Sequence, residues 1–197
     1  RRQMPLVAIN LREVCPDLPC LVTELAACSK LAIRHLTKLG HKRIALLGGV
    51  GAAQLTNTRE QGYLDEMERL GLEPYPMTAG EDALGGEAGI TSLFAQLGSR
   101  ERPTALVAFN DLVALGALRQ LKRLGLKVPE DIALVGCDNQ FFAPYTDPPL
   151  TTLDLHIEET SRLAMNLLVS AQTANLDAFA QHFEPTLIVR ESCGFMR

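Results

Sequence analysis

Amide and carboxylate side chains directly follow several strand-like runs of this sequence. Asn10 follows the run MPLVAI, Asn110 follows TALVAF, and Asp138 follows IALVGC. In open parallel sheets the carboxyl ends of the strands meet at one edge, and ligands bind there. Because each such side chain can engage two neighbouring hydroxyls, as a pyranose offers, the pattern predicts a site for a polyhydroxylated small molecule.

Arg59 is the cationic candidate for the same site. It falls in the first turn of a helix predicted over residues 58–70, where the helix dipole disfavours a cation. A carboxylate or a ligand is therefore expected beside it, and Asp138 is the candidate partner. The alternative is a solvated surface arginine.

Each strand-end residue also has an ordinary structural role open to it. Residues of these types commonly cap the helix that follows a strand, and we expect Asp111 to be such a cap. Asn110 suits capping and ligand contact equally well. Asp138 with Asn139 fits an Asx-type turn, and Asn10 fits a simple turn. The coincidence across several strand ends favours a binding site.

The sequence offers no constellation for catalysis or metal binding. The turn at residues 48–51 (GGVG) matches neither the dinucleotide fingerprint nor a phosphate loop, and no Gly-x-Ser-x-Gly elbow occurs. The four histidines are scattered, and the five cysteines lack zinc spacing. We therefore expect no enzyme activity, no cofactor and no metal. The cysteines are odd in number and irregularly placed, which suits a reducing compartment. We expect them to be small buried apolar residues.

Composition narrows the class of partner. With a formal net charge of −4, the chain is poorly suited to grip nucleic acid, which needs clustered Lys and Arg. No segment approaches the ~18 apolar residues of a membrane span, so no membrane partner is expected. A length of 197 residues suffices for one or two compact lobes. The chain opens with Arg-Arg-Gln and no Met, and we expect it to be an excerpt.

Strand-like and helix-like segments alternate along the chain with short connections. The predicted strands are residues 4–9, 44–47, 104–109, 132–136, 151–155 and 186–189. The predicted helices are residues 23–39, with Thr23 as cap, 58–70, 82–97, 111–124 and 157–171. Strands without clean alternation are buried on both faces, and the helices between them serve as crossovers. The pattern predicts a doubly wound α/β fold with a parallel sheet.

Six ordered blocks are similar to those of the lactose-repressor (LacI/GalR) family, over nearly the whole chain. They are residues 40–45 (GHKRIA), 58–63 (TREQGY), 110–118 (NDLVALGAL), 128–139 (VPEDIALVGCDN), 148–152 (PPLTT) and 185–192 (PTLIVRES). The resemblance implies a periplasmic-binding-protein-like core of two doubly wound lobes with an effector between them. It implies that residues 1–22 and 155–183 form a partial N-terminal lobe. Residues 23–154 and 184–197 would form the C-terminal lobe.

The resemblance also implies roles for individual residues. In the family, the Arg of the R-x-x-G-Y block, the Asn of the N-D block and the Asp of the G-x-D block bind the effector. They fall on Arg59, Asn110 and Asp138. A polar residue at the first strand end joins them, which falls on Asn10, where several relatives carry Asp.

Two further groups of residues follow from the resemblance. Some relatives place an aromatic platform where this chain reads GEDALGG, without an aromatic. Sugar stacking would then fall to Phe109, Phe141 or Phe142, with core packing as the alternative. A dimer interface would involve Leu115, Leu118 and Tyr145, again with core packing as the alternative.

The resemblance implies the effector-sensing core of a cytoplasmic bacterial transcriptional repressor. Such a homodimer binds a small sugar or related metabolite and controls operator DNA allosterically through a helix-turn-helix domain that this sequence does not contain. One alternative is a periplasmic sugar-binding protein, which shares the architecture but not the PPLTT and LIVRES ends. An enzyme that modifies nucleotides or sugars is the other.

Overall fold

The chain divides into two compact units, each built from segments that are distant in the sequence. Unit 1 consists of residues 1–24 and 155–185, and unit 2 of residues 25–154 and 186–197. The computed structural model describes residues 5–11, 15–48, 54–97, 102–170 and 180–194, with backbone only for 54–57.

Unit 2 is built on a six-stranded sheet with the strand order β4-β3-β5-β6-β7-β9. Every neighbouring pair is parallel except β7 with the edge strand β9, which is antiparallel. The strands are β3 (Ile44–Gly48), β4 (Tyr75–Thr78), β5 (Ala105–Ala108), β6 (Ala133–Cys137), β7 (Thr151–Asp154) and β9 (Thr186–Ile188). The central strands β5 and β6 are buried along their whole length, as expected of parallel strands covered by helices on both faces.

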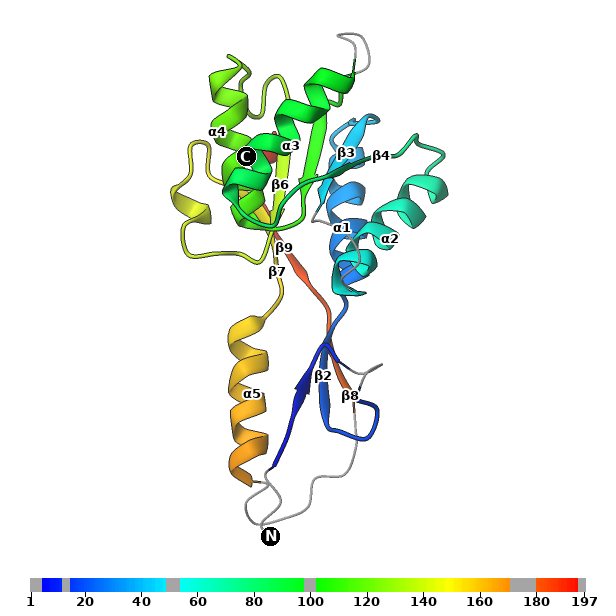
Figure 1. Cartoon of the computed structure of the whole chain (residues 1–197), viewed down its shortest axis with the longest axis vertical. Coiled ribbons are helices and arrows are strands. Elements are labelled where there is room, and N and C mark those ends of the chain that lie inside the picture. Colours follow the sequence, from blue (N-terminus) through cyan, green and yellow to red (C-terminus); the bar gives the residue numbers. More distant parts are fainter. Residues whose placement is uncertain (1–4, 12–14, 49–53, 98–101, 171–179, 195–197) are drawn as a thin grey trace. The chain divides into compact units, whose positions relative to one another are not determined.

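Two pairs of helices cover this sheet, and Figure 1 shows the pairs on opposite sides of it. One pair is α1 (Leu25–Lys38) with α2 (Gln54–Arg69), and the other is α3 (Ala83–Gln96) with α4 (Asp111–Arg123). One core cluster of the unit lies between α3, α4 and the strands and is almost entirely aliphatic. The short 3₁₀ helices η1 (Ala143–Tyr145) and η2 (Glu191–Cys193) complete the unit.

The block R-x-x-G-Y fixes how α1, α2 and β3 pack. A Cβ atom at Gly62 would lie 2.3 Å from the carbonyl oxygen of Ala26, so α1 and α2 approach too closely for any larger residue. The next residue, Tyr63, is fully buried. Its hydroxyl donates to the Ile44 carbonyl at 2.8 Å and accepts from the Tyr75 amide at 2.7 Å, which ties α2 to β3 and β4.

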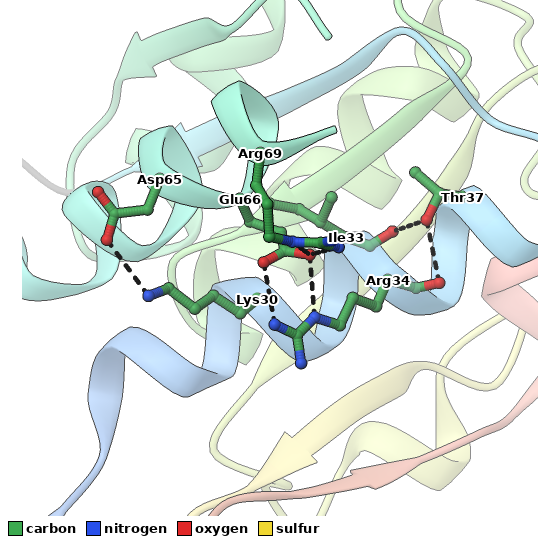
Figure 2. Close-up of polar contacts among 7 residues, drawn as sticks. All are labelled: Lys30, Ile33, Arg34, Thr37, Asp65, Glu66 and Arg69. Atoms are coloured by element: carbon green, nitrogen blue, oxygen red, sulfur yellow. Dashed lines mark hydrogen bonds and ion pairs between the residues drawn. The ribbon is translucent and has the colours of Figure 1, made fainter. Parts of the chain in front are cut away.

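A buried carboxylate joins the two helices further along (Figure 2). Glu66 is 1% exposed, yet Arg34 of α1 donates to both of its oxygens, at 2.9 and 3.1 Å. Arg69, one turn later in α2, donates from Nε at 3.0 Å. These guanidinium hydrogen bonds outweigh desolvation and lower the pKa of Glu66 to about 2. A nearby Lys30–Asp65 ion pair of 3.2 Å links the same helices.

Unit 1 is a small sheet with one long helix. Its strands β1 (Ala8–Ile9), β2 (Cys20–Thr23) and β8 (Ala180–Phe183) are parallel in the order β1-β2-β8. Helix α5 (Ile157–Ser170) packs apolar side chains against the strands of this sheet. Its core cluster consists of Leu21, Ala164 and Phe183, with Val7, Leu163 and Leu167 packed against it.

The predicted α/β fold with a parallel sheet is confirmed. The sequence prediction missed β2, β4 and β8, and it placed two helix starts wrongly. Thr23 ends β2 rather than capping α1, which begins at Leu25. Helix α2 begins at Gln54, four residues before the predicted start. The glycine-rich turn lies outside the described residues except for Gly48.

Replacing Glu66 tests the link between α1 and α2. Glu66→Gln is expected to lower the free energy of unfolding at pH 7 by about 2 kcal/mol, because it removes charge-assisted hydrogen bonds. Since the native pKa of about 2 lies below the ordinary value of 4.5, this stabilisation is present above pH 4.5 and is lost as the pH falls toward 2. Urea unfolding at pH 7 and pH 3 measures both effects.

The matched control is Glu158→Gln on α5. Glu158 pairs with Arg162 at 3.3 Å, but both side chains are exposed, so the pair contributes little. An equal loss of stability in the two variants would contradict the buried role of Glu66.

Candidate functional site

The predicted strand ends lie side by side at one edge of the unit 2 sheet. Strands β3, β5 and β6 are neighbours and run parallel, so their carboxyl ends share this edge. Asn110 follows β5 after Phe109, and Asp138 follows β6 directly. Helix α2, which carries Arg59, contacts β3. The structure therefore brings Arg59 and Asp138 together.

Arg59 makes three interactions at this edge. Its Nη2 atom lies 3.5 Å from Oδ1 of Asp138, and its Nη1 donates to the Phe109 carbonyl at 2.9 Å. Its guanidinium carbon stands 4.4 Å from the centroid of the Phe109 ring, a cation–π geometry. The expected carboxylate partner is thus confirmed, although Arg59 lies in the second turn of α2 rather than the first.

The guanidinium is largely removed from solvent. The Arg59 side chain is 11% exposed, and its Nε atom is buried with no hydrogen-bond partner among the described residues. Buried donors are nearly always paired, because an unpaired one costs free energy. Nε therefore has donor capacity left for an acceptor at this edge.

Asp138 has an unusual backbone and an unusual charge balance. Its φ of 106° lies in the region that residues with a Cβ atom rarely adopt, and such strain concentrates at binding sites. Burial raises the pKa of its carboxyl by disfavouring the charged form, while Arg59 opposes this shift. The result is a carboxylate whose charge depends on its arginine partner.

Asn110 is the helix cap that the sequence prediction had assigned to Asp111. Its Oδ1 accepts from the Val113 amide at 2.8 Å, and its Nδ2 donates to the Glu81 carbonyl at 2.9 Å. Capping leaves one amide hydrogen and one lone pair of Asn110 for other partners. Its role in binding an effector stays a prediction.

Asp111, the first residue of α4, instead holds the loop that follows β6. It is fully buried, and its Oδ1 accepts from the Thr152 hydroxyl at 2.6 Å. Its Oδ2 accepts from the Gln140 amide at 2.7 Å. A Cβ atom at Gly136 would lie 2.2 Å from Oδ1, so the glycine makes room for the carboxylate. Burial raises the pKa of Asp111 to about 6.

Asn10, the fourth predicted residue, lies in unit 1 at the end of β1. Its φ is 55°, and its Oδ1 accepts from the Thr23 amide at 2.7 Å. The side chain thus links the end of β1 to the end of β2 across 13 residues of sequence, rather than making a contact within its own turn. Its part in a site also stays a prediction.

The three aromatic candidates occupy different environments. Phe109 is half-buried and packs against the Arg59 guanidinium. Phe141 is 82% exposed and meets the half-buried Phe142 edge to face, with ring centroids 5.6 Å apart. Among the described residues, Phe109 is the one of the three whose ring contacts a predicted binding residue, Arg59.

A cavity of about 180 Å³ opens at the same edge of the sheet. It is lined by the ends of β3 and β4, by Glu60 of α2 and by Phe109. Arg59, Asn110 and Asp138 are not among the lining residues. Phe109 therefore links the cavity to the Arg59–Asp138 pair.

Metal sites and membrane-spanning helices are absent from the part of the chain that the structure describes. There, no group of three or more His, Cys, Asp or Glu side chains is arranged to hold a metal ion. No helix within the described ranges is long and apolar enough to cross a membrane. The cysteines are free thiols, and all but the half-buried Cys15 are buried, as predicted for small core residues.

Comparison with known proteins decides the family. Residues 33–193 match the family described as the periplasmic binding protein-like domain. The chain belongs to this family. Within it, the relatives are LacI-type regulators, which confirms the resemblance drawn from the six sequence blocks.

The LacI-family relatives cover most of the chain. The HTH-type transcriptional repressor CytR of Escherichia coli (strain K12) is 34% identical over 195 residues, which are 98% of this chain and 57% of CytR. A sugar-binding LacI-family regulator of Escherichia coli, solved with phosphate, is 26% identical with a TM-score of 0.78. That alignment covers 88% of this chain and 62% of the regulator.

The fold is also shared with a LacI-family regulator of Enterococcus faecium solved with bound ribose. Its TM-score is 0.86 at 23% identity, over 95% of this chain and 70% of that one. At this identity the likeness shows the fold alone. The chain spans little more than half the length of CytR.

The residues that the LacI-family resemblance assigned to a dimer interface differ in exposure. Tyr145 is 84% exposed and Leu115 37%, whereas Leu118 is 8% exposed and packs in the unit 2 core. Leu118 thus has the core position that was the stated alternative. An interface role for Leu115 and Tyr145 stays a prediction.

Asp111 offers a pH-dependent test of the unit 2 structure. Its native pKa of about 6 lies above the ordinary value of 3.8, so the native state holds the proton more tightly. The stability of the native chain should therefore fall as the pH rises from about 4 to about 6. Asp111→Asn is expected to remove this fall, as measured by urea unfolding at several pH values.

The control is Asp147→Asn, since Asp147 is 91% exposed. Its unfolding curve should follow the wild type across the pH range. If Asp111→Asn also ran parallel to the wild type between pH 4 and pH 6, the buried carboxylate would not have the raised pKa.

Proposed function

We propose that this chain is the effector-sensing core of a cytoplasmic bacterial transcriptional repressor, and that it binds a small sugar or related metabolite without transforming it. Residues 1–22 and 155–183 are assigned to the N-terminal lobe. Residues 23–154 and 184–197 are assigned to the C-terminal lobe. Operator DNA would be read by a helix-turn-helix domain outside this sequence, and the effector would change DNA affinity allosterically.

The observation that carries the proposal is the paired guanidinium and carboxylate at the sheet edge. Asp138 accepts hydrogen bonds from hydroxyl groups, and Arg59 donates from Nε to a hydroxyl oxygen. Because both groups are largely buried, a ligand that lacked the hydroxyls would leave the Arg59 Nε donor and the remaining lone pairs of Asp138 unpaired. Such a site selects a polyol over an apolar molecule of the same size.

The relatives support the same ligand class. One LacI-family relative, 26% identical, is described as sugar-binding. Sugar binding by the present chain is inferred from this relative and from the Arg59–Asp138 pair. The relatives are regulators, which does not favour a periplasmic sugar-binding protein.

Arg59→Ala tests the site. It is expected to weaken sugar binding about 100-fold, because charge-assisted hydrogen bonds to the ligand are lost. Calorimetry of the 197-residue chain with ribose, other pentoses and hexoses identifies the ligand and then measures the loss. Arg59→Lys keeps the charge but not the planar fork, so an intermediate loss is expected.

The matched control is Arg162→Ala, whose side chain is 66% exposed on α5. It should bind the same sugar with wild-type affinity. Undiminished affinity in Arg59→Ala would contradict the assigned site, and no heat from any sugar in the panel would contradict the ligand class.

We also propose that the chain dimerises through the exposed apolar face of α3 and α4. Leu84 is 70% exposed, Leu112 44% and Leu115 37%, and Tyr145 lies exposed in η1. A dimer would remove this apolar area from water, which favours association.

Sedimentation velocity tests the interface. Leu115→Asp is expected to shift the chain from dimer to monomer, since it buries a charge in the apolar contact. Met165→Asp, at a 58% exposed position on α5, serves as the control and should leave the dimer intact. A wild-type chain that sediments as a monomer at high concentration would contradict the proposal.

A further inference from the structure

The side chain of Asn139 joins the loop after β6 to the end of β7. Its Nδ2 donates to Oδ2 of Asp154 at 3.1 Å. Its Oδ1 accepts from Nη2 of Arg190 at 3.0 Å. The amide serves both partners at once, because it supplies a donor to the carboxylate and an acceptor to the guanidinium.

Arg190 anchors the side-chain amide of Asn139 to the start of β7. Its Nη1 donates to the Leu150 carbonyl at 2.6 Å, and its backbone amide donates to the Thr151 hydroxyl at 2.8 Å. Arg190 is half-buried. Asn139 is therefore held at both ends of its amide by groups fixed to β7.

The loop that carries Asn139 is the one that carries the binding carboxylate. Asp138 and Asn139 both have positive φ, at 106° and 47°. The backbone amide of Asn139 also donates to the Thr152 hydroxyl at 3.3 Å. A change at Asp138 must displace Asn139 as well, because one peptide bond joins them and the backbone has little freedom in these conformations.

Asp154 stands where the chain passes between its two units. It is the last unit 2 residue before Leu155 of unit 1, and it pairs across the sheet with Thr186, the first unit 2 residue after the return from unit 1. The chain passes between the units three times, and two of these passages have an end at the Asp154–Thr186 pair.

We propose that Asn139 is a positioning residue that couples the effector-binding carboxylate Asp138 to the strand pair Asp154–Thr186. This inference rests on the proposed function, since it assigns the regulation of the same site. Ligand contact at Asp138 favours one arrangement of the loop, and the Asn139–Asp154 hydrogen bond carries that preference to the strand pair. By linkage, a change at the strand pair alters effector affinity by the same factor.

Hydrogen exchange of the 197-residue chain tests the coupling without any ligand. Asn139→Asp sets two carboxylates against each other and is expected to speed exchange at residues 151–155 and 186–190 about tenfold. Asp154→Asn retains a neutral hydrogen bond, so an increase of about threefold is expected. The double variant Asn139→Asp/Asp154→Asn restores a carboxylate–amide pair with the roles exchanged, and its exchange should return to within about twofold of wild type.

Asn166→Asp is the matched control, because it adds the same charge at an exposed position on α5. It should leave exchange at both segments unchanged. Unchanged exchange in Asn139→Asp would overturn the coupling. Failure of the double variant to recover, whether by fast exchange or by failure to fold, would overturn it equally.

Calorimetry with ribose, or with the sugar that the panel identifies, supplies the functional readout. Asn139→Asp is expected to weaken binding about tenfold, and the double variant should recover most of the affinity. If no sugar bound the wild-type chain, the proposed ligand class would fail, and the exchange rates would still decide the coupling.

Discussion

The buried carboxylate of Asp111 is the interaction on which the candidate site depends. It receives hydrogen bonds from Thr152 of β7 and from the Gln140 amide, so that the start of α4, a neighbouring strand and the loop after β6 converge on one group. It adds to the contacts that support the positive φ angles of Asp138 and Asn139. The raised pKa of Asp111 is the free-energy cost of placing a charge there.

The segment R-x-x-G-Y shows how five residues can serve a site and a fold together. Arg59 reaches the sheet edge, Gly62 lets α1 approach α2, and Tyr63 ties the helix to β3 and β4. The geometry of Arg59 thus depends on its neighbours in the same turn of helix. Glu66 secures the next turn of α2 against α1.

The sequence predicted best what depends on local pattern. The aliphatic strands at residues 105–108 and 133–137 followed from hydrophobic runs, and Asp138 from its position after one of them. The Arg59–Asp138 pair was predicted from a first-turn position of Arg59 in its helix, and the pair is present although Arg59 lies in the second turn. Strands β4 and β8 were missed because they are sheet edges, half exposed and interrupted by Pro76 or by polar residues. Their conformation comes from pairing with a neighbour, which no local pattern records.

The same distinction applies within the site. The capping role of Asn110 was weighed correctly as an alternative, but the cap was assigned to Asp111, which has the same preference by residue type. The role of Asp111 depends on Thr152 and Gln140, which lie 41 and 29 residues away in the sequence. Only the assembled sheet brings them together.

The interleaving of the two units has a consequence for how the chain folds. Strand β2 pairs with β8, so that Cys20 meets Ala180 across about 160 residues of sequence. Such a contact closes late, because long loops are slow to form. During synthesis from the N-terminus, nearly all of unit 2 emerges before the strand that completes unit 1. The Arg59–Asp138 pair can therefore form on a chain whose unit 1 sheet still lacks β8.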